Sequence, residues 1–208
     1  AATTCVSESV VNAMTACLTN DYGNPSSTHG FGRSAKALIE QARKNIAKQL
    51  NVTPAEIVFT SGGTESNNFA IEGVAYALEE KGNHIITSAI EHHAISAPCK
   101  LLEKRGFEIT YVGVDKYGLV NPEDVKNAIT DKTILVSIMH ANNEIGTIEP
   151  IAEIGEITQK ANVLFHTDAV QALGKEKIEL TKEREERAAK QKELGGDGKN
   201  KSLAVQIS

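Results

Sequence analysis

Short runs rich in Val and Ile alternate with helix-periodic segments along most of this chain, and this alternation limits the possible folds most strongly. We predict strands at residues 57–60, 84–88, 108–112, 133–139 and 163–167, and helices at 35–50, 64–78, 94–104, 122–129 and 151–162. Apolar strands joined by helices form mostly parallel sheets that helices cover on both faces. The expected fold is therefore α/β, a three-layer sandwich with a mostly parallel sheet.

The two ends of the chain depart from this pattern. Near the start, Ser7 is placed to cap a helix, and a polar loop is expected over Asp21–Arg33. One side of that first helix carries Val10, Val11, Met14 and Leu18. After Leu180, a highly charged stretch at 181–194 leads into a linker-like stretch at 195–201 and a candidate strand at 203–207. We expect residues 1–180 to form one ligand-binding portion and residues 181–208 a separate charged, linker-like tail.

Charge and composition argue against several kinds of partner. The formal net charge is -5 and the pI is about 5.7, so neither nucleic acid nor an anionic membrane is expected as a partner. No apolar run approaches the roughly 20 residues of a membrane-spanning helix, and no signal peptide precedes Ala1. Cys5 has no metal-type or disulfide spacing to the other cysteines, while Cys17 and Cys99 fit helix positions where buried thiols are inert. We expect a cytoplasmic protein.

A strand, a Gly-rich turn and a helix follow one another over Thr60–Asn68. The free N–H groups and the positive end of the helix dipole at Ser61–Thr64 favour an anion such as a phosphate. Glycine at Gly63 lets the backbone approach that anion closely. A tight turn without a ligand is the competing interpretation.

Asp168 ends a strand of apolar or small residues, and Gln171 follows three residues later. A carboxylate in this position is suited to pair with a protonated pyridine nitrogen, and the amide could reach a phenolic oxygen on the same ring. The alternatives are a helix cap or structural salt bridge for Asp168, and a surface amide for Gln171.

Two more polar segments follow predicted strands. After the strand at 84–88 come Glu91, His92 and His93, where an imidazole is suited to stack on an aromatic cofactor and exchange protons with a substrate. Adjacent histidines point in different directions and no third ligand has matching spacing, so we expect no metal. Asn143, in a loop ending at Gly146, suits a substrate carboxylate or ring oxygen, or else forms an Asx-turn. The histidines expected to be structural are His29, His84, His140 and His166.

Ligands of parallel sheets bind at the carboxyl ends of the strands. The segments 61–64, 90–93, 141–146 and 168–171 should therefore meet at one edge. A phosphate site and a buried acid for a cationic ring at the same edge are what pyridoxal 5'-phosphate requires.

Six ordered blocks resemble the cysteine desulfurases of the NifS/IscS type, which are fold-type I pyridoxal phosphate enzymes. The blocks are Ala1–Thr4, Tyr22–His29, Phe59–Asn68, Glu91–His92, Asn142–Gly146 and His166–Gln171. The resemblance implies removal of sulfur from L-cysteine, giving alanine and an enzyme persulfide for iron–sulfur cluster assembly. It also implies a homodimer and a sulfur-acceptor or scaffold protein as partner, and it leaves selenocysteine open as a substrate. A different reaction such as transamination is disfavoured by the fourth and fifth blocks.

The resemblance also implies roles for single residues. Gly63 and Thr64 would hold the cofactor phosphate, and Asp168 would pair with the ring nitrogen. His92 would lie over the ring as the catalytic residue. The amides of Asn143 and Gln171 would lie at the phenolic oxygen.

The sequence departs from this family after Leu180. The family continues with a Ser-Gly-His-Lys block whose lysine carries the cofactor, yet no Gly-His-Lys occurs in this sequence. The substrate-binding arginine and the loop with the nucleophilic cysteine have no counterpart either. We therefore expect a truncated chain that is inactive as written. The alternative is a non-catalytic fragment or partner subunit that binds a full-length desulfurase or a scaffold.

Overall fold

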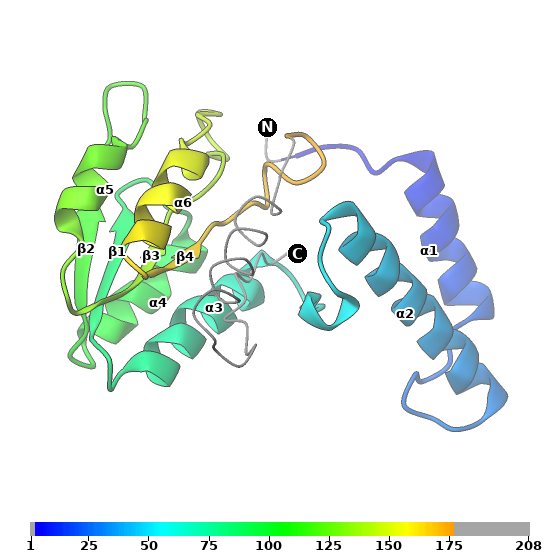
Figure 1. Cartoon of the computed structure of the whole chain (residues 1–208). Coiled ribbons are helices and arrows are strands. Elements are labelled where there is room, and N and C mark those ends of the chain that lie inside the picture. Colours follow the sequence, from blue (N-terminus) through cyan, green and yellow to red (C-terminus); the bar gives the residue numbers. More distant parts are fainter. Residues whose placement is uncertain (1–2, 177–208) are drawn as a thin grey trace. The chain divides into compact units, whose positions relative to one another are not determined.

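The computed structural model describes residues 3–176, and the described chain forms two compact units (Figure 1). The first unit runs from Thr3 to Ile57, and the second begins at Val58. The predictions for residues 181–208, including the strand at 203–207, lie outside the described residues. That residues 1–180 act as one ligand-binding portion stays a prediction.

The first unit is helical. It contains α1 (Glu8–Asn20), α2 (Gly30–Gln49) and a 3-10 turn, η1 (Pro54–Glu56). Ser7 occupies the N-cap position of α1, but its side chain makes no capping hydrogen bond, and its hydroxyl instead lies 3.1 Å from the Ser9 hydroxyl. The predicted helix at this place is confirmed. The apolar side chains that it carries are 46–75% exposed, and they are Val10, Val11, Met14 and Leu18.

The α2 helix begins five residues before the predicted start, so the predicted polar loop over 21–33 is four residues too long. The reason is a local cap, because Nδ1 of His29 accepts a hydrogen bond from the Gly32 N–H at 3.3 Å. Gly32 also allows a close approach, since a Cβ there would lie 2.4 Å from the carbonyl oxygen of Ser27. The cap and the glycine together start the helix early.

The second unit is built on a parallel sheet of four strands. These are β1 (His84–Ser88), β2 (Glu108–Val112), β3 (Thr133–Ser137) and β4 (Leu164–His166), in the spatial order β2-β1-β3-β4. The two central strands, β1 and β3, are buried along their whole length. The four predicted strands at these places are confirmed, although β3 and β4 are each two residues shorter than predicted.

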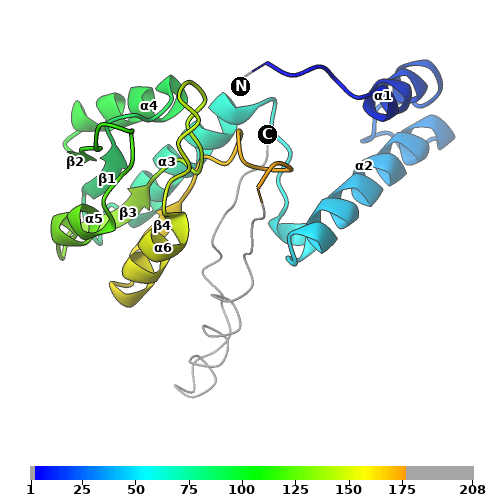
Figure 2. The same cartoon turned by 90° about the horizontal axis from the view of Figure 1, so that it is seen from above.

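Helices cover both faces of the sheet, which confirms the predicted three-layer α/β fold. Figures 1 and 2 show α3 (Gly63–Leu78) and α4 (His93–Glu103) on one face, with α5 (Pro122–Ala128) and α6 (Ile151–Lys160) on the other. Alternate residues of each strand serve the two faces. Ile85 therefore belongs to the core cluster under α3 and α4, and its neighbour Ile86 to the cluster under α5 and α6. Within residues 3–176, no helix combines the length and apolarity that crossing a bilayer requires.

The predicted buried strand at Ile57–Thr60 is wrong. The segment has no regular secondary structure and pairs with none of the four strands, and its side chains Val58 and Phe59 are 50% and 45% exposed. A run of β-branched and aromatic residues has strand propensity, but only a neighbouring strand in the sheet turns that propensity into a strand.

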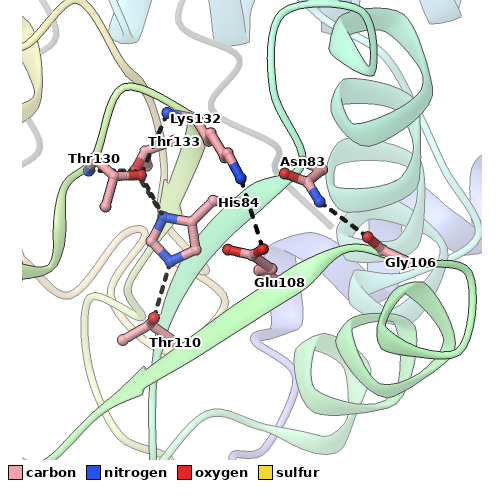
Figure 3. A network of polar contacts seen from close by, with 8 residues as sticks. All are labelled: Asn83, His84, Gly106, Glu108, Thr110, Thr130, Lys132 and Thr133. Carbon is pink, nitrogen blue, oxygen red and sulfur yellow. Dashed lines mark hydrogen bonds and ion pairs between the residues drawn. The ribbon is translucent and has the colours of Figure 1, made fainter.

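A polar network holds the amino-terminal end of the sheet (Figure 3). His84, the first residue of β1, bonds through Nδ1 to the Thr133 hydroxyl of β3 at 2.7 Å. Its Nε2 bonds to the Thr110 hydroxyl of β2 at 2.8 Å. Both ring nitrogens thus have partners, and burial lowers the pKa of this histidine. One side chain therefore links three adjacent strands, at the end of the sheet away from the candidate site.

Candidate functional site

The segments predicted to meet at the carboxyl ends of the strands are joined there by hydrogen bonds. The side-chain amide of Asn67, on α3, donates to Oδ2 of Asp168 at 2.8 Å. The His140 N–H donates to the backbone oxygen of Asp168 at 2.9 Å. The Met139 N–H donates to Oε1 of Glu91 at 2.8 Å. These bonds connect the start of α3 with the segments that follow β1, β3 and β4, so the predicted convergence is confirmed.

The start of α3 offers backbone donors. The N–H groups of Gly62, Gly63 and Thr64 have no hydrogen-bond acceptor among residues 3–176. The turn before them is held by Glu65, whose Oε2 accepts from the Ser61 hydroxyl at 2.7 Å and from the Ser61 N–H at 2.6 Å. These bonds lower the pKa of Glu65. The helix therefore presents free donors and its positive dipole end to an anion.

Asp168 lies two residues beyond β4 and is 8% exposed. Besides the Asn67 bond, its Oδ1 accepts from the Val170 N–H at 3.0 Å in a local turn, and no helix follows it among the described residues for Asp168 to cap. Among the ion pairs of the described residues, none includes Asp168. An ionised carboxylate has about four acceptor positions, so two such bonds leave capacity for a further donor.

A buried histidine lies two residues before Asp168. Nδ1 of His166 bonds to the Ser137 hydroxyl of β3 at 2.8 Å. Burial lowers the pKa of His166 to about 4, although the nearby Asp168 works in the opposite direction. This imidazole is therefore neutral near pH 7 and brings no positive charge next to Asp168.

His92 occupies the N-cap of α4, and its Nδ1 accepts from the Ala94 N–H at 3.1 Å. The ring is otherwise exposed. Since Nδ1 is an acceptor, the neutral ring carries its proton on Nε2. The capping bond, which sequence reasoning missed, fixes one edge of the imidazole and leaves the other free.

The loop over residues 140–149 is a short hairpin, with Ala141 bridged to Ile148. Its Asx-turn is made by Asn142, whose Oδ1 accepts from the N–H groups of Glu144 and Ile145 at 2.9 and 3.0 Å. Asn143 lies within that turn and is half-buried, but its own side chain has no hydrogen-bond partner among residues 3–176. The Asx-turn that was the alternative role for Asn143 is therefore made by Asn142, and the Asn143 amide is left for a ligand.

Gln171 is half-buried beyond Asp168. Its Oε1 accepts from Nζ of Lys175 at 3.1 Å, while its amide N–H groups have no acceptor among the described residues. The side chain therefore keeps its donors for a ligand oxygen.

Buried polar atoms that lack a partner among residues 3–176 gather at this edge. They are Thr87 Oγ1, Glu91 Oε2, His140 Nδ1, Glu149 Oε1, His166 Nε2 and Thr167 Oγ1. Buried polar groups in proteins are nearly always bonded to protein, water or ligand. Unused polar atoms, free helix donors and a buried carboxylate in one place fit a polar ligand that carries an anion and a cationic nitrogen, as pyridoxal phosphate does.

The burial of the cysteine thiols agrees with the prediction for Cys99 and differs from it for Cys17. Cys99 is buried on α4, and burial raises its pKa to about 12, as expected for an inert thiol. Cys17 is exposed on α1, so its predicted burial is wrong. The described part of the chain contains no group of three or more His, Cys, Asp or Glu residues with the geometry of a metal site.

Comparisons with known proteins agree with this architecture. The aminotransferase class-V family matches residues 1–184. The cysteine desulfurase IscS of Dictyoglomus turgidum is 58% identical over 174 residues, which cover 84% of this chain and 44% of that protein. A solved NifS-like protein superposes with a TM-score of 0.83 at 43% identity, covering 88% of this chain and 50% of that one. A structure named SspA in complex with cysteine gives a TM-score of 0.83 at 40% identity, covering 88% and 53%.

This chain thus spans about half the length of the proteins it matches. The family match covers most of the chain, and it includes every segment that meets at the carboxyl edge of the sheet. The chain belongs to the aminotransferase class-V family, and it is similar to cysteine desulfurases of that family.

Proposed function

We propose that this chain is the cofactor-binding portion of a pyridoxal phosphate-dependent cysteine desulfurase. The observation that carries the proposal is the Asn67–Asp168 hydrogen bond, because it ties the free N-terminus of α3 to a buried carboxylate at the same edge. An anion site and a cation site are thereby held together by one contact. The family membership supports the same cofactor.

The proposed residue roles follow from the donors and acceptors at this edge. The N–H groups of Gly63 and Thr64 would bind the cofactor phosphate, and Asp168 would accept a hydrogen bond from the protonated ring nitrogen. His92 would cover the ring, with Nε2 free to hold or release a proton. When bound, pyridoxal phosphate supplies an electron sink that weakens bonds at the α-carbon of an amino acid.

The amides of Asn143 and Gln171 would donate to the ring oxygen, and Asn143 would also orient a substrate carboxylate. L-Cysteine is the proposed substrate, since the 40% identical SspA was solved in complex with cysteine. Selenocysteine is the related alternative. A homodimer and a sulfur-acceptor or scaffold protein complete the proposal.

Binding of pyridoxamine 5'-phosphate tests the proposed site. This probe carries the same ring and phosphate but cannot form a Schiff base with surface lysines, and its fluorescence reports binding directly. We expect saturable binding by the full chain, weakened at least about tenfold in Asp168→Asn, since the loss of one hydrogen bond to a charged group costs roughly 1.5–3 kcal/mol. Asp131→Asn is the matched control because Asp131 is exposed and distant in the fold. Equal affinity in both variants would rule out Asp168 as the ring partner.

A second measurement addresses activity. We predict that the purified chain with pyridoxal phosphate releases no sulfide from L-cysteine, because the sequence contains no Gly-His-Lys block. Sulfide release well above a protein-free control would contradict this prediction. Co-purification with a full-length desulfurase would instead support the role of a non-catalytic partner subunit.

A further inference from the structure

Glu91 is a half-buried acid at this edge that the proposed cofactor chemistry does not use. It lies in the turn between β1 and α4, one residue before His92. Its Oε2 is buried without a partner among the described residues. Burial raises the pKa of its carboxyl to about 7, with Asp168 and Glu149 adding to the effect. Burying a carboxyl group in this way costs free energy, which the contacts of Glu91 must offset.

Those contacts join two neighbouring strand ends. Oε1 of Glu91 accepts from the hydroxyl of Ser88, the last residue of β1, at 2.7 Å. The same oxygen accepts from the N–H of Met139, two residues beyond β3, at 2.8 Å. Glu91 therefore closes its own turn and also attaches that turn to the next strand.

A second contact runs beside the first. The side-chain amide of Asn142 donates to the backbone oxygen of Ile90 at 3.3 Å, and its side-chain oxygen accepts from the N–H groups of Glu144 and Ile145 in the turn that contains Asn143. The two contacts hold the chain before His92 against the chain before Asn143. The hairpin that carries Asn143 is also anchored on Asp168, through the His140 N–H.

We propose that Glu91 is a positioning residue of the candidate cofactor site, whose Oε1 clamps the end of β1 to the end of β3 and thereby fixes the His92 imidazole. This inference rests on the proposed function for the ligand, but the clamp itself is a property of the chain without ligand. Glu91 need not touch the cofactor, since it acts through the backbone of the next residue.

The test uses the full chain and three variants. Glu91→Ala removes the acceptor, Glu91→Gln keeps an oxygen at Oε1 without the charge, and Glu80→Ala is the control at an exposed site. In the protein without ligand, hydrogen exchange of the Met139 amide should accelerate in Glu91→Ala and stay near wild type in the other two. An unchanged Met139 exchange rate in Glu91→Ala would refute the clamp whatever the ligand does.

The second readout is the dissociation constant of pyridoxamine 5'-phosphate. Glu91→Ala should weaken binding about tenfold, the lower end of the loss seen when second-layer partners of metal ligands are removed, and Glu91→Gln should restore most of it. If Glu91 acts through His92, the double variant with His92→Ala should bind no more weakly than His92→Ala alone. Additive losses would refute action through His92 and leave only a general structural role.

The outcomes separate this inference from the proposed function. Weaker binding in His92→Ala together with unchanged binding in Glu91→Ala would refute the inference and keep the function. No measurable binding by the wild-type chain would overturn both the function and the role of Glu91 in it. His93→Ala, an exposed neighbour, controls for the loss of an imidazole in this turn.

Discussion

The buried imidazole of His166 should make the stability of this chain fall at mildly acidic pH. Its ordinary pKa is 6.5, and burial lowers it to about 4 in the folded chain. Between these two values the unfolded chain binds a proton that the folded chain does not, so the free energy of unfolding decreases as the pH falls. At about 1.36 kcal/mol per pKa unit, the full loss is about 3 kcal/mol once the pH is below 4.

The assay is urea denaturation of wild type and His166→Asn at intervals between pH 4 and 7.5. Asparagine keeps a polar group for the Ser137 hydroxyl but does not titrate. The variant should be less stable at pH 7, and its deficit should shrink by about 3 kcal/mol as the pH falls to 4. The two proteins must be compared at each pH because Glu91 has the opposite effect. Its raised pKa makes the free energy of unfolding decrease as the pH rises from 4.5 to about 7, and this contribution is common to both proteins. A wild-type-minus-variant difference that does not change with pH would refute the reasoning about His166.

Three further predictions concern the core, the amino-terminal network and the thiols. Ile86→Ala should lower the free energy of unfolding by about 2–5 kcal/mol, because the side chain is fully buried under α5 and α6; chemical denaturation measures this loss, and a cost below 1 kcal/mol would contradict the packing. His84→Ala should cost about 1–3 kcal/mol by leaving buried threonine hydroxyls without a partner, yet keep the wild-type affinity for pyridoxamine 5'-phosphate, because the network of Figure 3 lies at the other end of the sheet. A thiol reagent should label Cys5 and Cys17 quickly and Cys99 only after unfolding; rapid labelling of three thiols in the folded chain would contradict the burial of Cys99.

The sequence predicted the elements well where local pattern decides them. β1 and β2 begin and end at the predicted residues, and α3, α4 and α5 are displaced by one residue at most. Runs of β-branched residues, periodic apolar positions and a Pro at the first turn of α5 act within a few residues of the chain. The N-terminal cap by His29 also acts locally, but a histidine cap is not among the usual signals, so the start of α2 was placed too late.

The site was predicted only in outline. The rule that strand ends converge was sufficient to bring together the segments that carry Thr64, His92, Asn143 and Asp168. Their bonding partners were not foreseen: Asn67 is 101 residues from Asp168 in the sequence, and Glu91 is 48 residues from Met139. In the sequence, Asn67 and Glu91 are visible only as an amide and an acid in or beside a motif. Their position in the sequence does not indicate which distant residue each will bond to.

The amino-acid sequence by itself determined four of the five predicted strands, the helices between them and the residue types that stand at the strand ends, because propensity and periodicity are properties of short stretches of chain. Only the tertiary structure decided the spatial order β2-β1-β3-β4, in which β1 lies beside β3 although β2 comes between them in the sequence. That order brings Glu91 to Met139, and the resulting four-stranded sheet of the described residues does not include Ile57–Thr60. Hydrogen bonds between distant residues depend on which strands become neighbours, and this is settled by packing both faces of the sheet at once.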